Sequence, residues 1–189
     1  MTDRPPGRSA GVSATTAAPP RVAAPPLTAA TFDALYRATA DDLYAYVATL
    51  VRDRAAAEDV VAAAFERAYR RVRSYDPRRG SARQWLFGIA RNAALDELRR
   101  RKRVATLAAE PGDADIASDD DTADPVRRAT VRTALAGLDP RDRELVALKF
   151  FAGLDNAEIA GVLGISPSNA GTRLHRAVQR LREACHAPS

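Results

Sequence analysis

Apolar residues recur along this chain at the three- and four-residue spacing of amphipathic helices, and no stretch shows the strict alternation of a half-buried strand. In the first half of the chain this spacing predicts helices over residues 31–51, 55–72 and 82–101, with Thr31 and Ser81 as caps of the first and third. The residues expected to form their buried faces are Leu35, Leu43, Tyr46, Val47 and Leu50, then Val60, Val61, Ala64, Phe65, Ala68 and Tyr69, then Leu86, Ile89, Ala90 and Ala93.

The second half of the chain predicts two more helices before its most informative segment. Asp124 and Pro125 open a helix that runs to about Ala136. Asp139 caps a second helix that begins at Pro140, because proline is well tolerated at a first helical position. The apolar residues of that second helix are Leu145, Val146, Leu148 and Phe151.

Residues 154–181 have the punctuation of a helix-turn-helix. Asp155 and Glu158 form a capping box for a first helix with Ile159, Val162 and Leu163 on one apolar face, and Gly164 supplies the backbone freedom that ends it. Ser166 caps a second helix that starts at Pro167 and is rich in arginine. Short polar residues and arginine near the start of such a helix suit the major groove of duplex DNA. The alternative is a plain helical hairpin with solvated arginines.

Charge divides the chain into segments. The 189 residues carry a net charge of +5, which favours a polyanionic partner. Residues 1–27 are rich in proline and alanine and carry +2, residues 28–103 carry +6, residues 104–125 carry −7 and residues 126–189 carry +4. We therefore expect a disordered tail over 1–27, a helical domain over 28–103, a flexible acidic linker over 104–125 and a second helical domain over 126–186. The predicted fold class is all-α.

Several functions lack support in the sequence. Cys185 is the only cysteine, which excludes an intrachain disulfide, and it lies beside His186 without enough further ligands to predict a metal site. No apolar run is long enough for a membrane span, and no secretory signal is evident at the N-terminus. No phosphate-binding loop, paired-histidine motif or nucleophile elbow is present, so we expect neither an enzyme nor a cofactor.

Residues 30–184 resemble the extracytoplasmic-function group of bacterial RNA polymerase sigma factors. The resemblance rests on residues 57–61, 65–71 and 75–101 in the first half. In the second half it rests on Leu138, Asp139, Arg143, Glu144, Glu158, Ile159, Ala160, Leu163, Gly164, Ser166, Thr172, Arg173, Leu174, His175, Arg176 and Ala177. It implies sigma regions 2 and 4, a cytoplasmic protein that joins the nucleoid within the holoenzyme, and RNA polymerase core and promoter DNA as partners. Many relatives are also held by an anti-sigma factor.

The resemblance implies a role for each segment of the first domain. It places the clamp coiled coil of the polymerase against Glu58, Asp59 and Glu66, although Ala62 and Ala63 stand where the family commonly has glutamine and an acid. It places the melted non-template strand against the loop before the third helix and the helix itself. The residues expected there are Tyr75, Arg79, Arg83, Trp85, Asn92, Asp96, Arg99 and Arg100. Aromatic, cationic and amide groups suit an unstacked base and its phosphate.

Alternative interpretations apply to several of these residues. Glu58 and Asp59 suit a solvated first helical turn, Trp85 suits a helical core, and the basic run 99–103 suits a solvated helix end. In the second domain the resemblance implies that duplex DNA contacts Ser168, Asn169, Thr172, Arg173, His175 and Arg176. Gly171 departs from the family, in which a basic residue is common. A stand-alone regulator and a sigma-like decoy are the rival functions.

Overall fold

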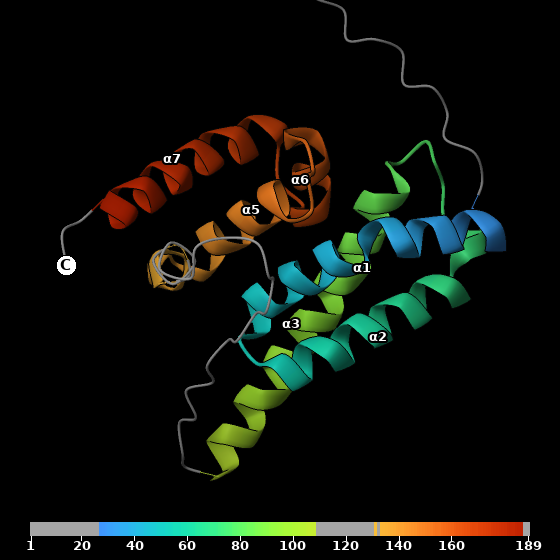
Figure 1. Cartoon of the computed structure of the whole chain (residues 1–189), viewed down its shortest axis with the longest axis horizontal. Helices are drawn as coiled ribbons and strands as arrows, with labels where there is room; N and C mark the ends of the chain where they lie inside the picture. The colour runs from blue at the N-terminus through green and yellow to red at the C-terminus, as the bar shows by residue number, and fades with distance from the viewer. Residues whose placement is uncertain (1–26, 109–130, 132, 187–189) are drawn as a thin grey trace, which may run out of the picture.

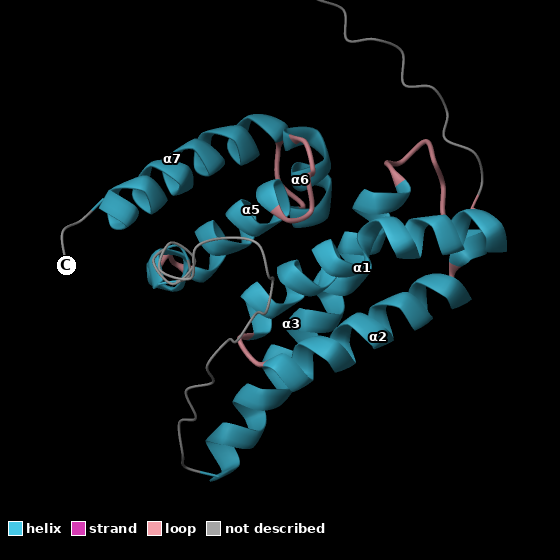
Figure 2. Cartoon of the chain, in the orientation of Figure 1, coloured by secondary structure: helices cyan, strands magenta, loops and turns pink. Residues whose placement is uncertain are grey.

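The computed structural model describes residues 27–108, 131 and 133–186, and every regular element in that part of the chain is helical (Figure 2). The predicted all-α fold is confirmed. The elements are α1 (Ala29–Val51), α2 (Arg54–Arg70), a short 3₁₀ helix η1 (Val72–Ser74), α3 (Ala82–Ala108), α5 (Pro140–Phe150), α6 (Asn156–Leu163) and α7 (Pro167–His186). Residues 131 and 133–137 are also helical. The predicted N-terminal tail and most of the predicted acidic linker lie outside the described residues.

Local capping signals set most helix starts where the sequence predicts them. The Ser81 hydroxyl accepts a hydrogen bond from the Gln84 amide at 3.1 Å and caps α3. Asp139 accepts from two amides at the start of α5, and the Asp155 and Glu158 capping box opens α6. Gly164 ends α6 in the left-handed region at φ 69°, which a residue without a Cβ adopts at little cost. These caps confirm the helix-turn-helix punctuation.

The first and third helices depart from the predicted bounds. The cap of α1 is Thr28 rather than Thr31, because Thr31 occupies the third position of a reciprocal capping box and its hydroxyl lies 2.6 Å from the Thr28 amide nitrogen. Helix α3 continues to Ala108, past the expected end at Arg101. No glycine or proline follows Arg101 before Pro111, so nothing in the sequence breaks the helix inside the basic run.

Helices α1, α2 and α3 pack side by side, and α5 and α6 lie against α1 and α3 (Figure 1). One hydrophobic core runs through both groups of helices: Leu43, Tyr46 and Phe87 belong to the same buried cluster as Leu148 and Ile159. The first group, α1 to α3, and the second group, α5 to α7, pack on each other directly, and we call them the two units. We call this packing of α5 and α6 on α1 and α3 the closed arrangement.

One predicted core residue is wrong. The Tyr69 side chain is 58% exposed, whereas its neighbour Phe65 is buried. Tyr69 lies in the last turn of α2, where its ring packs against the Phe32 ring at a centroid distance of 5.4 Å. It therefore covers the rim of the core instead of entering it.

No helix in the described residues is long and apolar enough to cross a membrane.

Leu43→Ala tests the core. Leu43 is fully buried in the cluster formed by α1, α2 and α3, so truncation leaves a cavity as well as losing burial. We expect the free energy of unfolding to fall by about 2–5 kcal/mol, measured by urea denaturation. The control is Val104→Ala, which shortens a side chain that is 53% exposed and should change stability little. Equal effects of the two substitutions would contradict the core assignment.

Candidate nucleic-acid and polymerase interfaces

The three predicted polymerase-binding acids all lie on α2 and are exposed. Glu58 pairs with Arg54 at 3.2 Å and Glu66 pairs with Arg70 at 2.6 Å, in each case one helical turn apart and in water. Such pairs contribute little to stability, so the carboxylates can exchange partners at low cost. Asp59 has a different neighbour, Arg100 of α3. The pKa of Arg100 is raised mainly by Glu97 and to a smaller extent by Asp59.

A pocket of about 470 Å³ lies between the loop that precedes α3 and the first turns of that helix. We call it the loop pocket. Four of the predicted single-strand residues line it, namely Tyr75, Arg79, Trp85 and Asn92. Its other lining residues are Ser74, Asp76, Gly80, Ser81, Gln84, Gly88, Ile89, Gly161 and Val162. The pocket therefore combines aromatic surface, a cation and an amide.

Tyr75 and Trp85 give the loop pocket its aromatic wall. Their ring centroids are 5.6 Å apart, and the Tyr75 hydroxyl donates a hydrogen bond to the Gly80 carbonyl oxygen at 3.0 Å. Tyr75 is buried and holds the loop, and its burial raises the pKa of its hydroxyl. Trp85 is half-buried, with one part packed against the core and another part facing the pocket. The two interpretations of Trp85 are thus compatible.

Helix α6 of the second unit forms part of the pocket wall. Gln84 fits between two glycines: a Cβ on Gly161 would lie 2.1 Å from its Nε2, and a Cβ on Gly80 would lie 2.1 Å from its Oε1. Beside it, the Ser81 hydroxyl lies 2.5 Å from the Glu158 carboxylate of α6. In the closed arrangement, Gly161 and Val162 of α6 therefore line the loop pocket together with residues of the first unit.

Arg83 does not line the loop pocket, although the sequence groups it with the residues that do. Its guanidinium pairs with Asp42 of α1 and donates to the Ala152 carbonyl oxygen in the second unit. It also lies over the Phe87 ring, 5.3 Å from the centroid. Arg83 thus joins the two units in the closed arrangement.

A buried carboxylate joins the two units through hydrogen bonds from two side chains. Glu144 of α5 accepts from Arg91 Nε at 2.6 Å and from Arg91 Nη2 at 3.4 Å, and Tyr46 Oη lies 3.3 Å from the same carboxylate. Only 10% of the Glu144 side chain is exposed. Burial, together with the Glu144 charge, raises the pKa of Tyr46 well above its usual range, so this hydroxyl keeps its proton and acts as a donor.

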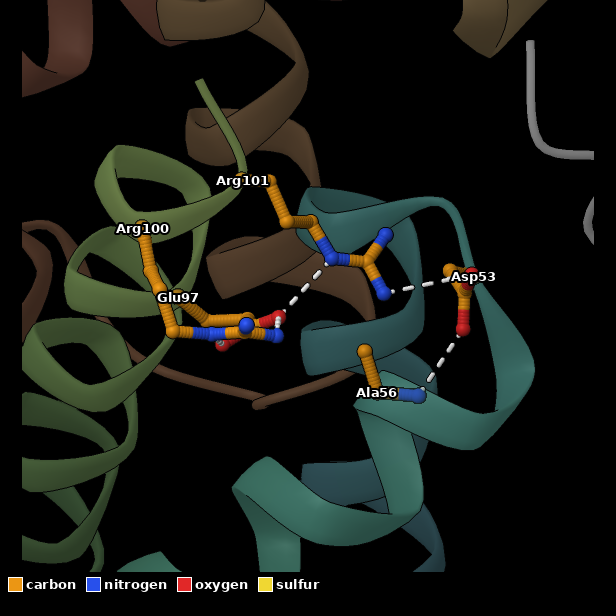
Figure 3. Close-up of polar contacts among 5 residues, drawn as sticks. All are labelled: Asp53, Ala56, Glu97, Arg100 and Arg101. Atoms are coloured by element: carbon orange, nitrogen blue, oxygen red, sulfur yellow. Dashed lines mark hydrogen bonds and ion pairs between the residues drawn. The ribbon is translucent and has the colours of Figure 1, made fainter. Parts of the chain in front are cut away.

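The basic residues 99–101 of α3 have more intramolecular partners than the sequence suggests. Asp96 pairs with Arg99 at 3.0 Å, and Glu97 pairs with both Arg100 and Arg101 at 2.7 and 2.8 Å. Arg101 also forms an ion pair with Asp53, the cap of α2, as Figure 3 shows. Hydrogen bonds from Arg100 and Arg101 lower the pKa of Glu97 to about 2, and the Ala56 amide lowers the pKa of Asp53. Of these pairs, that of Arg101 with Asp53 joins α3 to the start of α2, whereas the pairs of Asp96 and Glu97 lie within α3.

Helix α7 presents a polar face to solvent. The exposed predicted duplex-binding residues are Ser168, Asn169, Thr172, His175 and Arg176. Arg173 lies on the flank of that face, half-buried and 3.8 Å from the carboxylate of Asp142 in α5. Arg180 binds the same carboxylate, and burial raises the pKa of Asp142. Arg173 and Arg180 therefore fix the orientation of α7 on α5.

Sequence reasoning missed two kinds of site residue. Gly88 and Ile89 follow Trp85 by three and four positions and precede Asn92 similarly, so helical spacing could have placed them in the pocket. The contacts that Gln84 and Glu144 make across the two units leave no such signal, because they join residues far apart in the sequence. Within the described residues, no three histidine, cysteine or acidic side chains are grouped to hold a metal.

Comparisons with known proteins identify both units. Residues 35–104 match the model of sigma-70 region 2, and residues 128–181 match that of sigma-70 region 4. The chain is 37% identical over 153 residues to the RNA polymerase sigma factor CarQ of Myxococcus xanthus, covering 80% of this chain and 87% of CarQ. It is 34% identical over 156 residues to the ECF RNA polymerase sigma factor SigL of Mycobacterium tuberculosis, covering 82% and 88%.

Two solved structures share the fold. The sigma factor RpoE of Bartonella quintana, in complex with the anti-sigma factor NepR, superposes with a TM-score of 0.74 at 22% identity, covering 84% of this chain and 99% of RpoE. CnrH, in complex with the cytosolic domain of CnrY, gives a TM-score of 0.62 at 26% identity, covering 86% of this chain and 92% of CnrH. The fold similarity therefore extends over both units.

Glu97→Gln tests the ion pairs of Glu97 within α3. A carboxyl whose pKa falls from 4.5 to about 2 on folding stabilises the protein above pH 4.5, and this stabilisation is lost as the pH falls toward 2. We expect the variant to lose on the order of 1 kcal/mol at pH 7. The difference from the unmodified protein should shrink between pH 4.5 and 2 in urea denaturation series. Glu66→Gln, in an exposed pair, is the control and should change little.

Proposed function

Because this chain belongs to the extracytoplasmic-function family of RNA polymerase sigma factors, with sigma-70 regions 2 and 4, we propose that its loop pocket receives a base of the melted promoter strand while α7 binds upstream duplex. As a sigma factor it binds the polymerase core and promoter DNA and directs promoter recognition and transcription initiation. It is not an enzyme. The observation that supports the proposal most directly is the joint lining of one pocket by Tyr75, Trp85, Arg79 and Asn92.

The loop pocket has the chemistry that an unstacked base requires. Trp85 offers a ring face for stacking, and stacking of a base on an aromatic side chain contributes about 1–3 kcal/mol. Asn92 is exposed at the rim and carries both a donor and an acceptor for a base edge. Arg79 is exposed and suits the adjoining phosphate. Holding the base in this way offsets the cost of unstacking it, a few kcal/mol.

The proposed roles of the remaining sequence-predicted residues divide by their partners. The exposed α7 residues Thr172, His175 and Arg176 face the groove, whereas Arg173 orients the helix through Asp142. Arg83 becomes available to the melted strand only when it leaves the Ala152 carbonyl. Asp96, Arg99 and Arg100 can meet phosphates after exchanging their exposed intramolecular partners. Glu58, Asp59 and Glu66 are the proposed contacts with the clamp coiled coil of the polymerase.

In the proposed mechanism, the closed arrangement restricts the access of a base to the loop pocket. Gly161 and Val162 of α6 line the pocket, and Arg83 and Glu144 hold the two units together. The α7 face is exposed in the same arrangement. The proposed order of events is therefore upstream duplex first, then separation of α6 from α3, then entry of the base.

The closed arrangement also suggests how the protein is regulated. One protein of similar fold, the sigma factor RpoE, is seen in complex with the anti-sigma factor NepR. Our proposal includes a partner of this class that stabilises the closed arrangement and so keeps the loop pocket guarded. It places the protein in the cytoplasm, on the nucleoid when it is in the holoenzyme.

Run-off transcription with purified polymerase core on genomic promoter fragments tests the two DNA sites separately. Asn92→Ala should lower promoter opening by about tenfold with little change in holoenzyme retention on duplex, because it removes a contact made only to a flipped base. Arg176→Ala should instead lower retention, with a shallower salt dependence. Permanganate reactivity of thymines measures opening, and gel retention measures binding. Unchanged output from both variants would contradict the site assignments.

Glu144→Ala tests the closed arrangement. Removing the carboxylate leaves Arg91 and the Tyr46 hydroxyl without their shared partner inside the interface, while the contacts within each unit remain. With fluorophores on Cys185 and on a cysteine introduced at exposed Arg67, we expect the mean label distance to increase and single-stranded promoter DNA to bind severalfold more tightly.

Asp33→Ala is the matched control for Glu144→Ala. It also deletes one carboxylate from an ion pair with arginine, but that pair is exposed and lies within α1. It should change neither the label distance nor the affinity for single-stranded DNA. If Glu144→Ala gives the same label distance as the control, the carboxylate does not hold the units together.

A further inference from the structure

Both units line the loop pocket. Tyr75 and Asn92 belong to the loop before α3 and to α3 itself, whereas Gly161 and Val162 belong to α6. The volume of about 470 Å³ lies within the range of about 300–1,000 Å³ that is usual for small-molecule sites, which occur preferentially where two domains meet. Separation of the units removes the α6 part of the wall, so the complete pocket belongs to the closed arrangement alone.

Gly88 gives this pocket a floor without a side chain. It lies inside α3, three residues after Trp85 and four before Asn92, so the three residues share one side of the helix. Apart from the backbone of its own helix, a Cβ on Gly88 would have no heavy atom within 4 Å. Crowding therefore does not explain a residue that costs up to about 1 kcal/mol relative to alanine inside a helix. Gly88 leaves a hollow between Trp85 and Asn92.

The groups around this hollow suit a planar ring that carries hydrogen-bonding nitrogens. Trp85 offers a ring face for stacking. Asn92 carries a donor and an acceptor, the combination that binds adenine through two hydrogen bonds. Ile89 and Val162, both half-buried, line the same space with apolar groups. A purine, with two fused rings, fills such a space and stacks over a larger area than a pyrimidine does.

Arg79 gives the pocket a positive charge. Its side chain is exposed. Asp76 is the only acid that lines the pocket among the described residues, and its carboxylate accepts from the Arg78 amide at 3.0 Å and from Arg78 Nε at 3.2 Å. These hydrogen bonds lower the pKa of Asp76 and engage its charge. An anionic group on a ligand can therefore pair with the Arg79 guanidinium, whose geometry suits a phosphate.

We propose that the loop pocket of the closed arrangement binds a free purine nucleotide, which contacts α3 and α6 at once and so holds the two units together. This inference rests on the proposed base-binding function of the same pocket. A base within a strand brings a nucleotide on either side, for which α6 has to move, whereas a free nucleotide has no such neighbours. The nucleotide thus favours the closed arrangement and competes with the melted strand.

Trp85 is the only tryptophan in the chain, so its fluorescence responds to a ligand in the pocket. We expect adenosine monophosphate, titrated into the full chain, to quench this fluorescence to saturation. Cytidine monophosphate, with a single ring, should bind severalfold more weakly, and so should adenosine, which lacks the phosphate. A response to all three compounds that is equal and does not saturate would overturn the inference.

Gly88→Ala tests the hollow. The added methyl group meets no neighbouring atom, so thermal unfolding should show a variant at least as stable as the unmodified protein. It occupies the space of the bound ring, so the affinity for adenosine monophosphate should fall about tenfold. Gly137→Ala is the matched control, because a Cβ there also meets no atom within 4 Å and Gly137 does not line the pocket. Equal affinities of the two variants would contradict binding in the hollow.

Glu144→Ala separates this inference from the proposal on which it rests. Because the variant favours separation of the units, it should bind adenosine monophosphate severalfold more weakly and single-stranded promoter DNA more tightly. If both ligands bind more tightly, the nucleotide does not need α6 and the inference is wrong, while the strand-binding proposal stands. If the nucleotide binds as expected but Asn92→Ala leaves the affinity for single-stranded DNA unchanged, the strand-binding proposal is wrong and the nucleotide site stands.

Discussion

One buried carboxylate makes polar contacts with two helices of the other unit, inside a hydrophobic core that both units share. Glu144 belongs to α5, but its hydrogen-bond partners, Arg91 and Tyr46, belong to α3 and α1. Taking a carboxylate out of water is costly unless its lone pairs are satisfied, and here both oxygens have a partner. The same requirement makes the contact reversible, because water can replace these partners at a small net cost once the helices separate. A contact of this kind suits the proposed separation of the two units.

The position of the second unit follows from that contact. With α5 held against α1 and α3, α6 comes to lie over the loop that precedes α3, and Gln84 fills the space between Gly80 and Gly161. Arg83 completes the junction through Asp42 and the Ala152 carbonyl. A residue that resembles a DNA contact in sequence is thus a contact between units in this arrangement. The proposed contact of Arg83 with DNA requires it to leave these partners first.

The elements that the sequence predicted well are those that depend on neighbours in the chain. Caps such as Asp155 and Ser166, the stop at Gly164 and the buried faces of the helices all follow from residues within one or two turns. The loop pocket was predictable in part for the same reason: Tyr75 to Asn92 is a short span, and helical spacing groups Trp85 and Asn92 on one side of α3. That these residues bind a melted strand stays a prediction, since the fold explains their grouping and not their ligand.

The sequence could not predict contacts between residues far apart in the chain. It also could not decide between two residues that are equally good candidates for one helix cap. Glu144 reads as an ordinary charged residue of a helix, and nothing nearby in sequence marks it as buried with Arg91. Thr28 and Thr31 are both good caps, and only the reciprocal hydrogen bonds decide between them. Tyr69 has the spacing of a core residue, but it lies where α2 ends and α1 begins, so the core does not reach it.

Residues of α5 and α6 hold α7 in place, and this matters for the exchange of promoter specificity between proteins of this fold. Asp142 on α5 holds Arg173 and Arg180 on one flank of α7, and Asn156 on α6 fits against Gly171 on the other. A transplanted α7 would therefore arrive without the two residues that set its rotation about its own axis. The transferable module is the whole of residues 139–182, because the helix that reads DNA is aimed by the two helices that carry it.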